Sequence, residues 1–268
     1  MDARELFQSG RLEEALSELK QQIRGKPGDP NLRVFLFQLL SVVGDWERAL
    51  DQLELVGEMD DDSLLMVQLY RVALECEPLR AGTFAGERTP LFVGEPGEWQ
   101  GAWAKANELA GQGHAEASEK MREQAWGEMP SLSGTINGEP FEWIMDGDSR
   151  LGPCVEAMLE NKYFWVPLTC VRKMQVEEPT DVRHLVWVPV MFEWQNGGDV
   201  GGLMPVRYPG SESHEDSAIR LARRTDWVEQ DGAYHGVGQK MLLTDAGEYP
   251  LLEAREIRIE VDESAEEG

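Results

Sequence analysis

Apolar residues recur at helical spacing through residues 1–77. In the first clear stretch they are separated by one, three and four positions, which places them on one face of a helix. These residues are Ala15, Leu16, Leu19 and Ile23. Gly25 and Pro27 end the pattern, and Asp29 followed by Pro30 supplies an N-cap with proline at the first helical position. Further stripes follow at 32–43 and 64–74, so we predict paired helices here.

Two of these helical stretches repeat each other at an offset of 34 residues. The string GRLEEAL at 10–16 recurs as GDWERAL at 44–50, and Leu19 maps onto Leu53. This offset is the length of a tetratricopeptide helix–turn–helix unit. Such units stack through one face and present another to a partner. The repeat therefore predicts that the protein binds a partner and does not predict catalysis.

The chain between residues 78 and 97 is interrupted by proline and glycine, which predicts a connecting segment or an irregular docking loop. Two further helices are expected at about 98–111 and 114–126. Gly113 follows Gly44 at close to two more periods, so this helix pair is a candidate degenerate repeat.

After Pro130 short runs of β-prone residues dominate. They cover residues 141–144, 163–168, 184–194, 203–207, 241–244 and 256–261. In the last run Ile257 and Ile259 alternate with Arg258 and Glu260, as in a strand with one buried face.

The strands are expected to be joined by a glycine-rich hairpin connection and interrupted by two helices. The glycines at 197–198 and 201–202 predict the hairpin. The helices are expected at about 152–161 and 215–224. This mixture predicts an α+β fold for the second half.

We divide the chain into three parts. A tetratricopeptide-like helical domain covers 1–128 and a β-rich α+β domain covers 129–262. An acidic, disordered tail follows at 263–268. The fold class is thus α+β and multidomain, with helical hairpins first.

The chain carries a formal charge of −25, from 50 acidic and 25 basic residues. Phosphate backbones and anionic membranes require a basic surface, so nucleic acid and membrane are excluded as expected partners. A basic or amphipathic protein segment is a better match, because opposite charges speed and orient an encounter. The simpler alternative is that the charge only keeps the protein soluble.

The first residues include acids and lack an apolar core, which does not fit a signal peptide. No run approaches the ~20 apolar residues needed to cross a bilayer. The three cysteines, Cys76, Cys154 and Cys170, form no metal or redox motif and no disulfide framework. We therefore expect a cytoplasmic protein.

The string DGDSR at 146–150 begins like a calcium loop, but Arg150, Leu151 and Ala157 stand where a ligand, a glycine and a carboxylate are required. We expect a structural turn, in which Asp146 or Asp148 binds backbone amides and Arg150 pairs with a carboxylate. No metal or other cofactor is expected.

Two other features suggest chemistry only weakly. The string GVGQK at 236–240 lacks the spacing of a phosphate loop, so a turn before the strand at 241 is expected. Four tryptophans lie in predicted strands, where core packing is more common than a ligand platform. They are Trp143, Trp165, Trp187 and Trp194.

Eight segments in the second half occur in an order that is familiar from one family. They are PFEWI at 140–144, DGDSRLGP at 146–153, YFWVP at 163–167, LVWVP at 185–189, RYPGS at 207–211, TDW at 225–227, GVGQK at 236–240 and EYPLL at 248–252. With the N-terminal repeats and GEPGEW at 94–99, the chain resembles the ImpE/SciE/TagJ family of type VI secretion accessory proteins.

The resemblance implies a non-enzymatic cytoplasmic accessory protein. It implies binding to the N-terminal amphipathic helix of the small contractile-sheath subunit, and an indirect link to the recycling ATPase. It implies no residue-level site. The residues that we select as partner-binding or structural are Trp46, Asp146, Asp148, Arg150, Trp187, Arg207 and Tyr208.

An alternative hypothesis is enzymatic. It places a hydrolase-like pocket around Asp146, Asp148, Arg150 and Arg207, with the repeats acting only in recruitment. A third possibility is a structural scaffold whose partners belong to the same machine.

Overall fold

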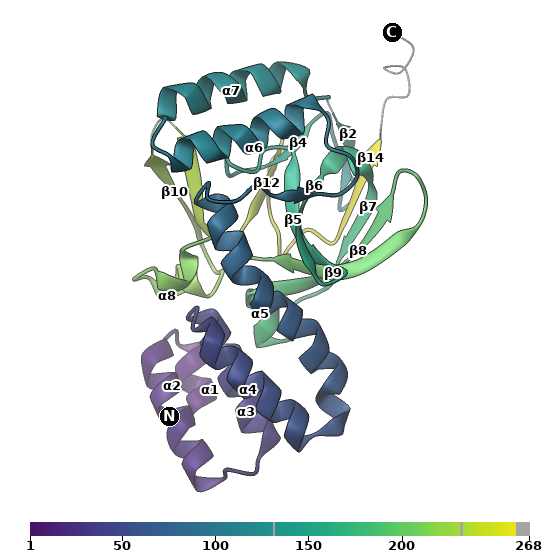
Figure 1. Ribbon diagram of the computed structural model, residues 1–268. Coiled ribbons are helices and arrows are strands. Elements are labelled where there is room, and N and C mark those ends of the chain that lie inside the picture. The colour runs from purple at the N-terminus through teal and green to yellow at the C-terminus, as the bar shows by residue number, and fades with distance from the viewer. Residues whose placement is uncertain (131, 231–232, 261–268) are drawn as a thin grey trace.

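The computed structural model describes residues 1–130, 132–230 and 233–260 (Figure 1). Its first helices are α1 (Ala3–Gln8), α2 (Leu12–Gly25), α3 (Pro30–Val42), α4 (Trp46–Met59) and α5 (Leu64–Phe84). Helices α1 and α2 pack together, as do α3 and α4. The predicted tetratricopeptide-like hairpins are confirmed, and they form the lower end of the molecule in Figure 1.

The turns of the two hairpins are equivalent. Gly10 and Gly44 have φ angles of 78° and 73°, in the left-handed region that glycine adopts without strain. Asp29 caps α3 as predicted, because its carboxylate accepts a hydrogen bond from the amide of Asn31 at 3.0 Å, and Pro30 opens the helix.

The connecting segment expected from residue 78 starts later than predicted. A short 3₁₀ helix, η1 (Asp61–Ser63), leads into α5, which continues through Pro78 to Phe84. A proline inside a helix removes one hydrogen bond and is unfavourable. Here the last turns of α5 bury Glu77, Arg80 and Phe84 in the body of the molecule. This tertiary packing keeps the helix intact beyond the proline.

The next two helices agree with the prediction. Helices α6 (Glu98–Gly111) and α7 (Ala115–Glu128) pack on each other. They lie at the opposite end of the molecule from α1–α4, and α5 connects the two ends (Figure 1). A Cβ atom on Gly111 would lie 2.0 Å from the carbonyl oxygen of Ala85, so only glycine permits this close approach between the ends of α5 and α6.

Most of the strands form one nine-stranded sheet in the order β1-β6-β5-β9-β8-β7-β14-β2-β3. The bounds are β1 Leu91–Phe92, β2 Ser133–Ile136, β3 Glu139–Phe141, β5 Cys154–Leu159, β6 Lys162–Pro167, β7 Val171–Val176, β8 Trp187–Trp194, β9 Asp199–Pro205 and β14 Glu256–Glu260. Neighbours pair antiparallel, except that β1 and β6 are parallel.

The remaining strands form two small sheets. Strands β10 (Thr225–Gln230) and β11 (Ala233–Gly238) make a two-stranded ribbon. Strand β12 (Met241–Thr244) pairs with β13 (Glu248–Pro250) and with β4 (Ile144–Asp146). Short helices lie between strands: η2 Leu168–Cys170, η3 Val182–Leu185, η4 Ser211–Ser213 and α8 Ser217–Arg220. The α+β class is confirmed.

Four local predictions in this half are wrong. The strand expected at 141–144 is interrupted, because β3 ends at Phe141 and β4 begins at Ile144. Within 152–161 the chain forms strand β5 (Cys154–Leu159) instead of a helix, and all six residues of β5 are buried because it is an inner strand of the large sheet. The helix expected at 215–224 is limited to α8. Residues 236–238, expected in a turn, belong to β11.

The glycine-rich connection is confirmed in part. Gly197 and Gly198, with φ of 84° and 88°, join β8 to β9 as a hairpin. Gly201 and Gly202, however, lie inside β9. A Cβ atom on Gly202 would lie 2.5 Å from the carbonyl oxygen of Met158 in β5. The glycine therefore permits close strand contact. The predicted acidic tail lies outside the described residues.

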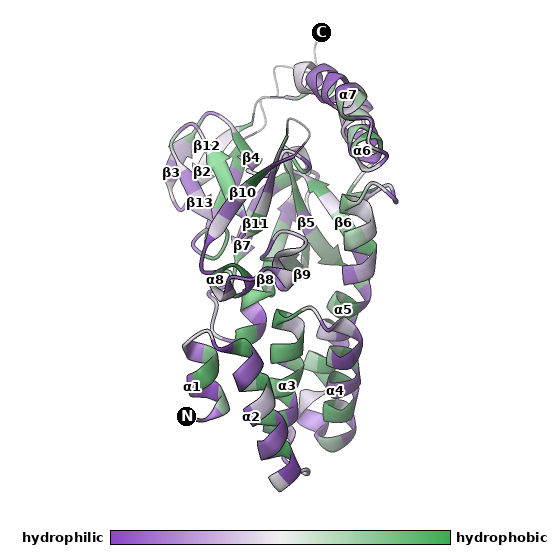
Figure 2. Ribbon diagram, turned by 90° about the vertical axis from the view of Figure 1, so that its left-hand side faces the viewer, coloured by the Kyte–Doolittle hydropathy of each residue, from purple (hydrophilic) through white to green (hydrophobic). Residues whose placement is uncertain are grey.

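Two apolar clusters form the core. One joins the helical hairpins to the sheet, because it includes Phe37 of α3, Tyr70 of α5, and Trp165 and Trp187 of the sheet. The other lies within the strand-rich part, around residues such as Phe192. Figure 2 shows the helices of the hairpins standing directly below the sheets. Among the described residues, no helix is long and apolar enough to cross a membrane.

Candidate functional site

The residues selected from the sequence gather where the hairpins and α5 meet the strands. Trp46 and Trp187 begin α4 and β8, and Asp146 ends β4. Asp148 and Arg150 lie in the loop that follows β4, and the pair at 207–208 follows β9. One continuous series of contacts connects all seven residues, through four more residues that the sequence analysis did not select. These four are Glu77, Arg80, Glu156 and Lys240.

At the centre of this series is a buried group of charges, which we call the junction network: Glu77, Arg80, Asp146, Glu156 and Lys240. Arg80 of α5 contacts Glu156 of β5 through two bonds, Nε to Oε1 at 2.5 Å and Nη2 to Oε2 at 3.1 Å. Lys240 Nζ lies 2.6 Å from the other side of the same carboxylate. None of the three side chains is more than 5% exposed. The network therefore ties α5 to the sheet.

The electrostatics of Glu156 follow from these neighbours. Burial by itself would raise the pKa of its carboxyl group, but the positive charges of Arg80 and Lys240 outweigh burial and lower the pKa to about 2. Tyr163 adds a hydrogen bond from its hydroxyl to Oε1 at 2.7 Å. Glu156 is thus a stable anion between two cations, and an isolated buried charge would be far less favourable.

At Asp146 the effect of burial on the pKa outweighs that of the neighbouring cation. Burial raises the pKa of its carboxyl group to about 6, and Lys240, at 3.5 Å, opposes this only in part. Oδ1 accepts the hydroxyl of Tyr208 at 2.9 Å and the amide of Asp148 at 2.8 Å. Asp146 therefore holds the beginning of the loop and the residue after Arg207 in place.

Asp148 pairs with Arg150, as the sequence predicted for a structural turn. Arg150 donates from Nε and Nη2 to the two carboxylate oxygens at 2.9 and 2.6 Å. The amide of Gly236 in β11 donates to the same carboxylate at 2.9 Å. Burial opposes ionisation here too, but the arginine outweighs it and lowers the pKa of Asp148. The pair fixes the loop to the β10–β11 ribbon.

Arg207 attaches the second hairpin. Its Nη1 donates to the carbonyl of Val42 at 2.7 Å and Nη2 to that of Ser41 at 3.2 Å, both at the end of α3. The last carbonyls of a helix have no partner within the helix and carry partial negative charge, so a cation stabilises them. Burial lowers the pKa of Arg207 to about 10.

The two selected tryptophans lie at the same junction. The rings of Trp46 and Trp187 have centroids 5.8 Å apart. Trp187 is fully buried and donates from Nε1 to Glu77 Oε1 at 2.7 Å. Burial raises the pKa of Glu77, while Arg80 on the next turn of α5 opposes this. The aromatic and ionic contacts thus meet on one side of α5.

The sequence contains only weak indications that these four additional residues belong to the site. Glu156 is the single charge in the apolar run CVEAML, which is typical of a buried and paired carboxylate. Its partner Arg80 lies 76 positions away, in the segment 78–97 for which the sequence predicts a connecting segment or a docking loop. Only the folded chain brings them together.

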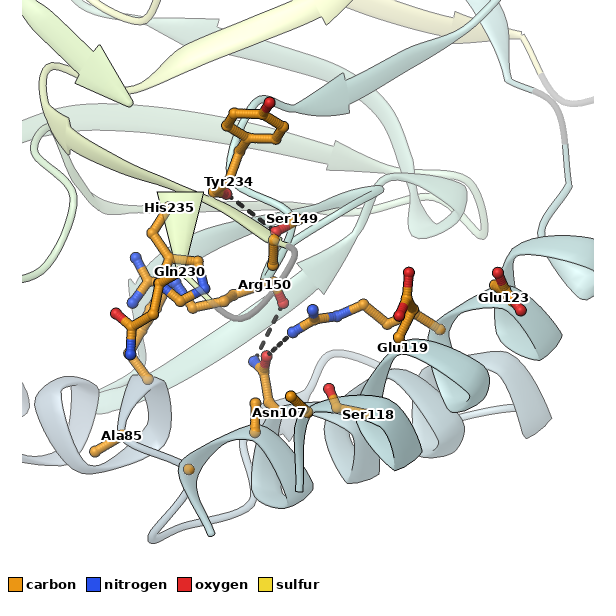
Figure 3. A pocket seen from close by; sticks show the side chains of 16 residues that line it. Ala85, Asn107, Ser118, Glu119, Glu123, Ser149, Arg150, Gln230, Tyr234 and His235 are labelled. Atoms are coloured by element: carbon orange, nitrogen blue, oxygen red, sulfur yellow. Dashed lines mark hydrogen bonds between the residues drawn. The ribbon is translucent and has the colours of Figure 1, made fainter. Parts of the chain in front are cut away.

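A groove lies beside the junction, between helices α6 and α7 and the β10–β11 ribbon (Figure 3). Its polar part has a volume of about 420 Å³. Asn107 contacts both walls: it donates to the carbonyl of Arg150 at 3.2 Å and accepts from Arg122 at 2.9 Å. Across the groove, Ser149 donates its hydroxyl to the carbonyl of Tyr234 at 3.0 Å. The groove can accept a polar side chain or small ligand.

The groove continues into an apolar part of about 330 Å³ that Trp103, Trp126, Met145 and Tyr234 line. Trp126 and Tyr234 are 52% and 57% exposed. The two indole rings have centroids 6.4 Å apart. This end of the groove can accept an apolar group.

The residues of the hydrolase hypothesis are mostly committed to the fold. Asp146, Asp148 and Arg207 are 2%, 0% and 3% exposed, and each binds protein atoms as described above. Arg150 lines the polar part of the groove, although its guanidinium is paired with Asp148. In the portion of the chain that the structure describes, no group of three or more His, Cys, Asp or Glu side chains could hold a metal ion.

Stacked helical hairpins fixed by a buried junction to a strand-rich body define a tetratricopeptide-type protein, a class that fits protein–protein interaction. The tetratricopeptide repeat model matches residues 6–70, and the ImpE protein model matches residues 138–258. The chain belongs to the ImpE/TagJ family.

Two similar proteins extend over almost the whole chain. The type VI secretion system accessory component TagJ of Pseudomonas aeruginosa is 44% identical over 260 residues, which cover 97% of this chain and 92% of that protein. The crystal structure of protein VPA1032 from Vibrio parahaemolyticus superposes with a TM-score of 0.87 at 25% identity. That match covers 98% of this chain and 99% of the other.

Proposed function

We propose that this protein is a non-enzymatic accessory component of a type VI secretion system. Its role is to bind the N-terminal amphipathic helix of the small contractile-sheath subunit and to assist sheath assembly or recycling in the cytoplasm. The recycling ATPase is an indirect partner. The accessory role follows the name of the Pseudomonas relative.

The observation that carries the proposal is the attachment of the tetratricopeptide-like hairpins. Arg207, the junction network and the packing of Trp46 on Trp187 hold the hairpins rigidly on the body. Stacked hairpins present an extended surface for another polypeptide, and a rigid surface loses little entropy when it binds.

Charge supports the choice of partner. The chain carries −25, and most of its acids are on exposed positions. Such a surface attracts a helix with lysine and arginine flanks and speeds the encounter. It disfavours nucleic acid and anionic membranes for the same reason.

The test is co-elution of the full-length protein with the purified small sheath subunit in size-exclusion chromatography, followed by titration. The matched control is the same subunit without its N-terminal helix. We expect a complex with the complete subunit only, and an affinity that falls several-fold between about 50 and 500 mM salt because exposed charges are screened. Absence of binding at tens of micromolar would reject the proposal.

The hydrolase alternative has less support, because three of its four residues are buried and bound. It predicts that an Arg150→Gln variant remains folded and still binds the sheath subunit but no longer supports secretion. The accessory proposal predicts that secretion follows subunit binding in every folded variant.

A further inference from the structure

Helix α5 is the last helix of the tetratricopeptide-like stack, and it ends the stack in an unusual way. The turns after the first helices of the two hairpins are at Gly10 and Gly44, 34 residues apart. The next position in this series is Pro78, which lies inside α5. The third turn is therefore not made, and α5 continues as one helix into the body of the molecule.

The two long helices that follow α5 lie away from its first half. Helix α6 begins at Glu98, and Figure 1 shows it with α7 at the opposite end of the molecule. The terminal helix of a repeat stack normally needs a polar outer face, because nothing covers it. The outer face of α5 departs from this rule.

We define the leucine face as Leu65, Leu69 and Val72 of α5, at spacings of four and three. Leu65 is 79% exposed and Leu69 41% exposed, and Val72 is half-buried. Positions i, i+4 and i+7 lie along one side of a helix. The exposed part of this side ends near Val72, because Cys76, one turn further on, is 2% exposed.

The leucine face, from Leu65 to Val72, spans about 10 Å at 1.5 Å per residue, or about two turns of a helix. Large exposed apolar side chains that follow one line on an otherwise polar surface mark an interaction site. The grouping is specific: within the first four turns of α5, apolar side chains occupy the outer side as well as the buried side.

The charges around the leucine face are acidic. Asp61 and Asp62 precede α5, and Glu75 lies on its exposed side. Arg71 is the one basic residue in the first half of α5, and its guanidinium already pairs with Glu54 of α4 at 3.0 Å. An apolar stripe with an acidic border complements a helix that carries an apolar stripe with lysine or arginine beside it.

We infer that the leucine face is the docking surface for a basic amphipathic helix of the partner, which packs along α5 as the helix that the third repeat lacks. This inference rests on the proposed function, because it assigns the sheath-subunit helix to one surface of this protein. The leucines supply the buried apolar area, and the acids set orientation and rate of association.

The experiment is fluorescence anisotropy with a labelled synthetic peptide of the N-terminal helix of the small sheath subunit. The full-length protein is compared with the double variant Leu65→Lys/Leu69→Lys. The variant keeps good helix formers at exposed positions, so its free energy of unfolding should change by less than about 0.5 kcal/mol. The matched control is Leu91→Lys, since Leu91 is 52% exposed but lies on β1, away from the first half of α5.

We expect the double variant to bind the peptide at least tenfold more weakly and Leu91→Lys to bind it like the original protein. Equal binding by all three proteins would overturn the docking surface and leave the proposed function intact. No binding by the original protein would overturn both. Light scattering adds one more outcome: a dimer that Leu65→Lys/Leu69→Lys converts to a monomer would show that a second copy occupies the face, which contradicts the inference.

Discussion

Helix α5 carries both the leucine face and two residues of the junction network, Glu77 and Arg80, and it reverses the usual distribution of apolar and charged residues. In the second half of α5, Glu77 and Arg80 are buried at 5% and 4% exposure. In the first half, Leu65 is 79% exposed. Buried charges are stable only with fixed partners, so they determine where the helix sits. Exposed leucines have no partner within the fold, so they are available to another chain.

The comparison shows that burial, and not residue type, distinguishes the residues that position the elements of the fold from those that are available to bind a partner. The sequence predicts a structural turn at 146–150 and offers an enzymatic pocket as the alternative, and in the structure the charged residues of this loop hold the fold together. Leu65 and Leu69 of α5 look like core residues in the sequence, but they are exposed. The predictions below test the junction side of this comparison, in order of expected effect.

Removing one partner of the junction network should have the largest effect. Arg80→Ala leaves Glu156 buried with half of its ionic contacts, and we expect a loss of about 3–5 kcal/mol in the free energy of unfolding. Urea unfolding followed by circular dichroism measures it. The matched control is Arg172→Ala, whose side chain is 61% exposed in its pair with Glu193 and should contribute under about 1 kcal/mol. Equal losses would remove the distinction between buried and exposed pairs.

Asp146 makes the junction sensitive to pH. Its pKa is about 6 in the folded protein against 3.8 for the unfolded group. The folded state therefore binds more protons between these values, so the stability from this group is fully present below pH 3.8 and is lost as the pH rises through 6. Asp146→Asn removes this loss, so the unfolding free energy of the variant minus that of the original protein should rise by up to about 3 kcal/mol between pH 4 and 7.5.

The pH prediction depends on the change of that difference and not on its value at one pH. Asparagine carries its own cost at position 146, but this cost does not titrate in the range. Unfolding curves at four or five pH values measure the change. A difference that stays constant would mean that Asp146 titrates near its ordinary value, and that the junction does not disfavour its charge.

Substitutions in the turns of the two hairpins should have the smallest effect on the free energy of unfolding. They test whether the contact between the hairpins and the body reaches the turn at Gly44. A Cβ atom on Gly44 would lie 2.4 Å from Cγ and 2.9 Å from Cβ of Glu212, in the body of the molecule. On Gly10 the nearest atom is Cβ of Ser217, at an ordinary 3.5 Å. Gly10→Ala should cost about 1–2 kcal/mol from backbone strain alone. Gly44→Ala should cost about 1 kcal/mol more, because the strand-rich body is displaced.

Thermal or urea unfolding of the two glycine variants tests this order. Identical losses would mean that the second hairpin is no more closely attached to the body than the first. A larger loss for Gly10→Ala would contradict the packing directly.

Much of the fold could be predicted where the signal is local. The offset of 34 residues identified both hairpins, and the spacing of apolar residues identified helices α2 and α3. The alternation at 256–260 identified β14. Local signals fail where the environment decides: CVEAML became the inner strand β5 because neighbouring strands pair with it on both sides, and α5 continued through Pro78 because the body of the protein buries its end.

The candidate site divides in the same way. The sequence predicted that Arg150 pairs with a carboxylate in a structural turn, and the structure shows that this carboxylate is Asp148, two residues away. It could not identify Arg80 with Glu156, because no pattern connects residues 76 positions apart. It also could not separate the outer from the inner leucines of α5, because the helix is apolar on both sides.

By itself, the sequence determined the repeated hairpins, the α+β class and the strongly negative charge, since these depend on spacing and composition. The tertiary structure decided that the motif charges are buried in a junction and that Leu65 and Leu69 of α5 remain exposed. The physical reason is that burial is a property of the whole assembly of elements: which side of a helix meets water depends on what the rest of the chain places against it.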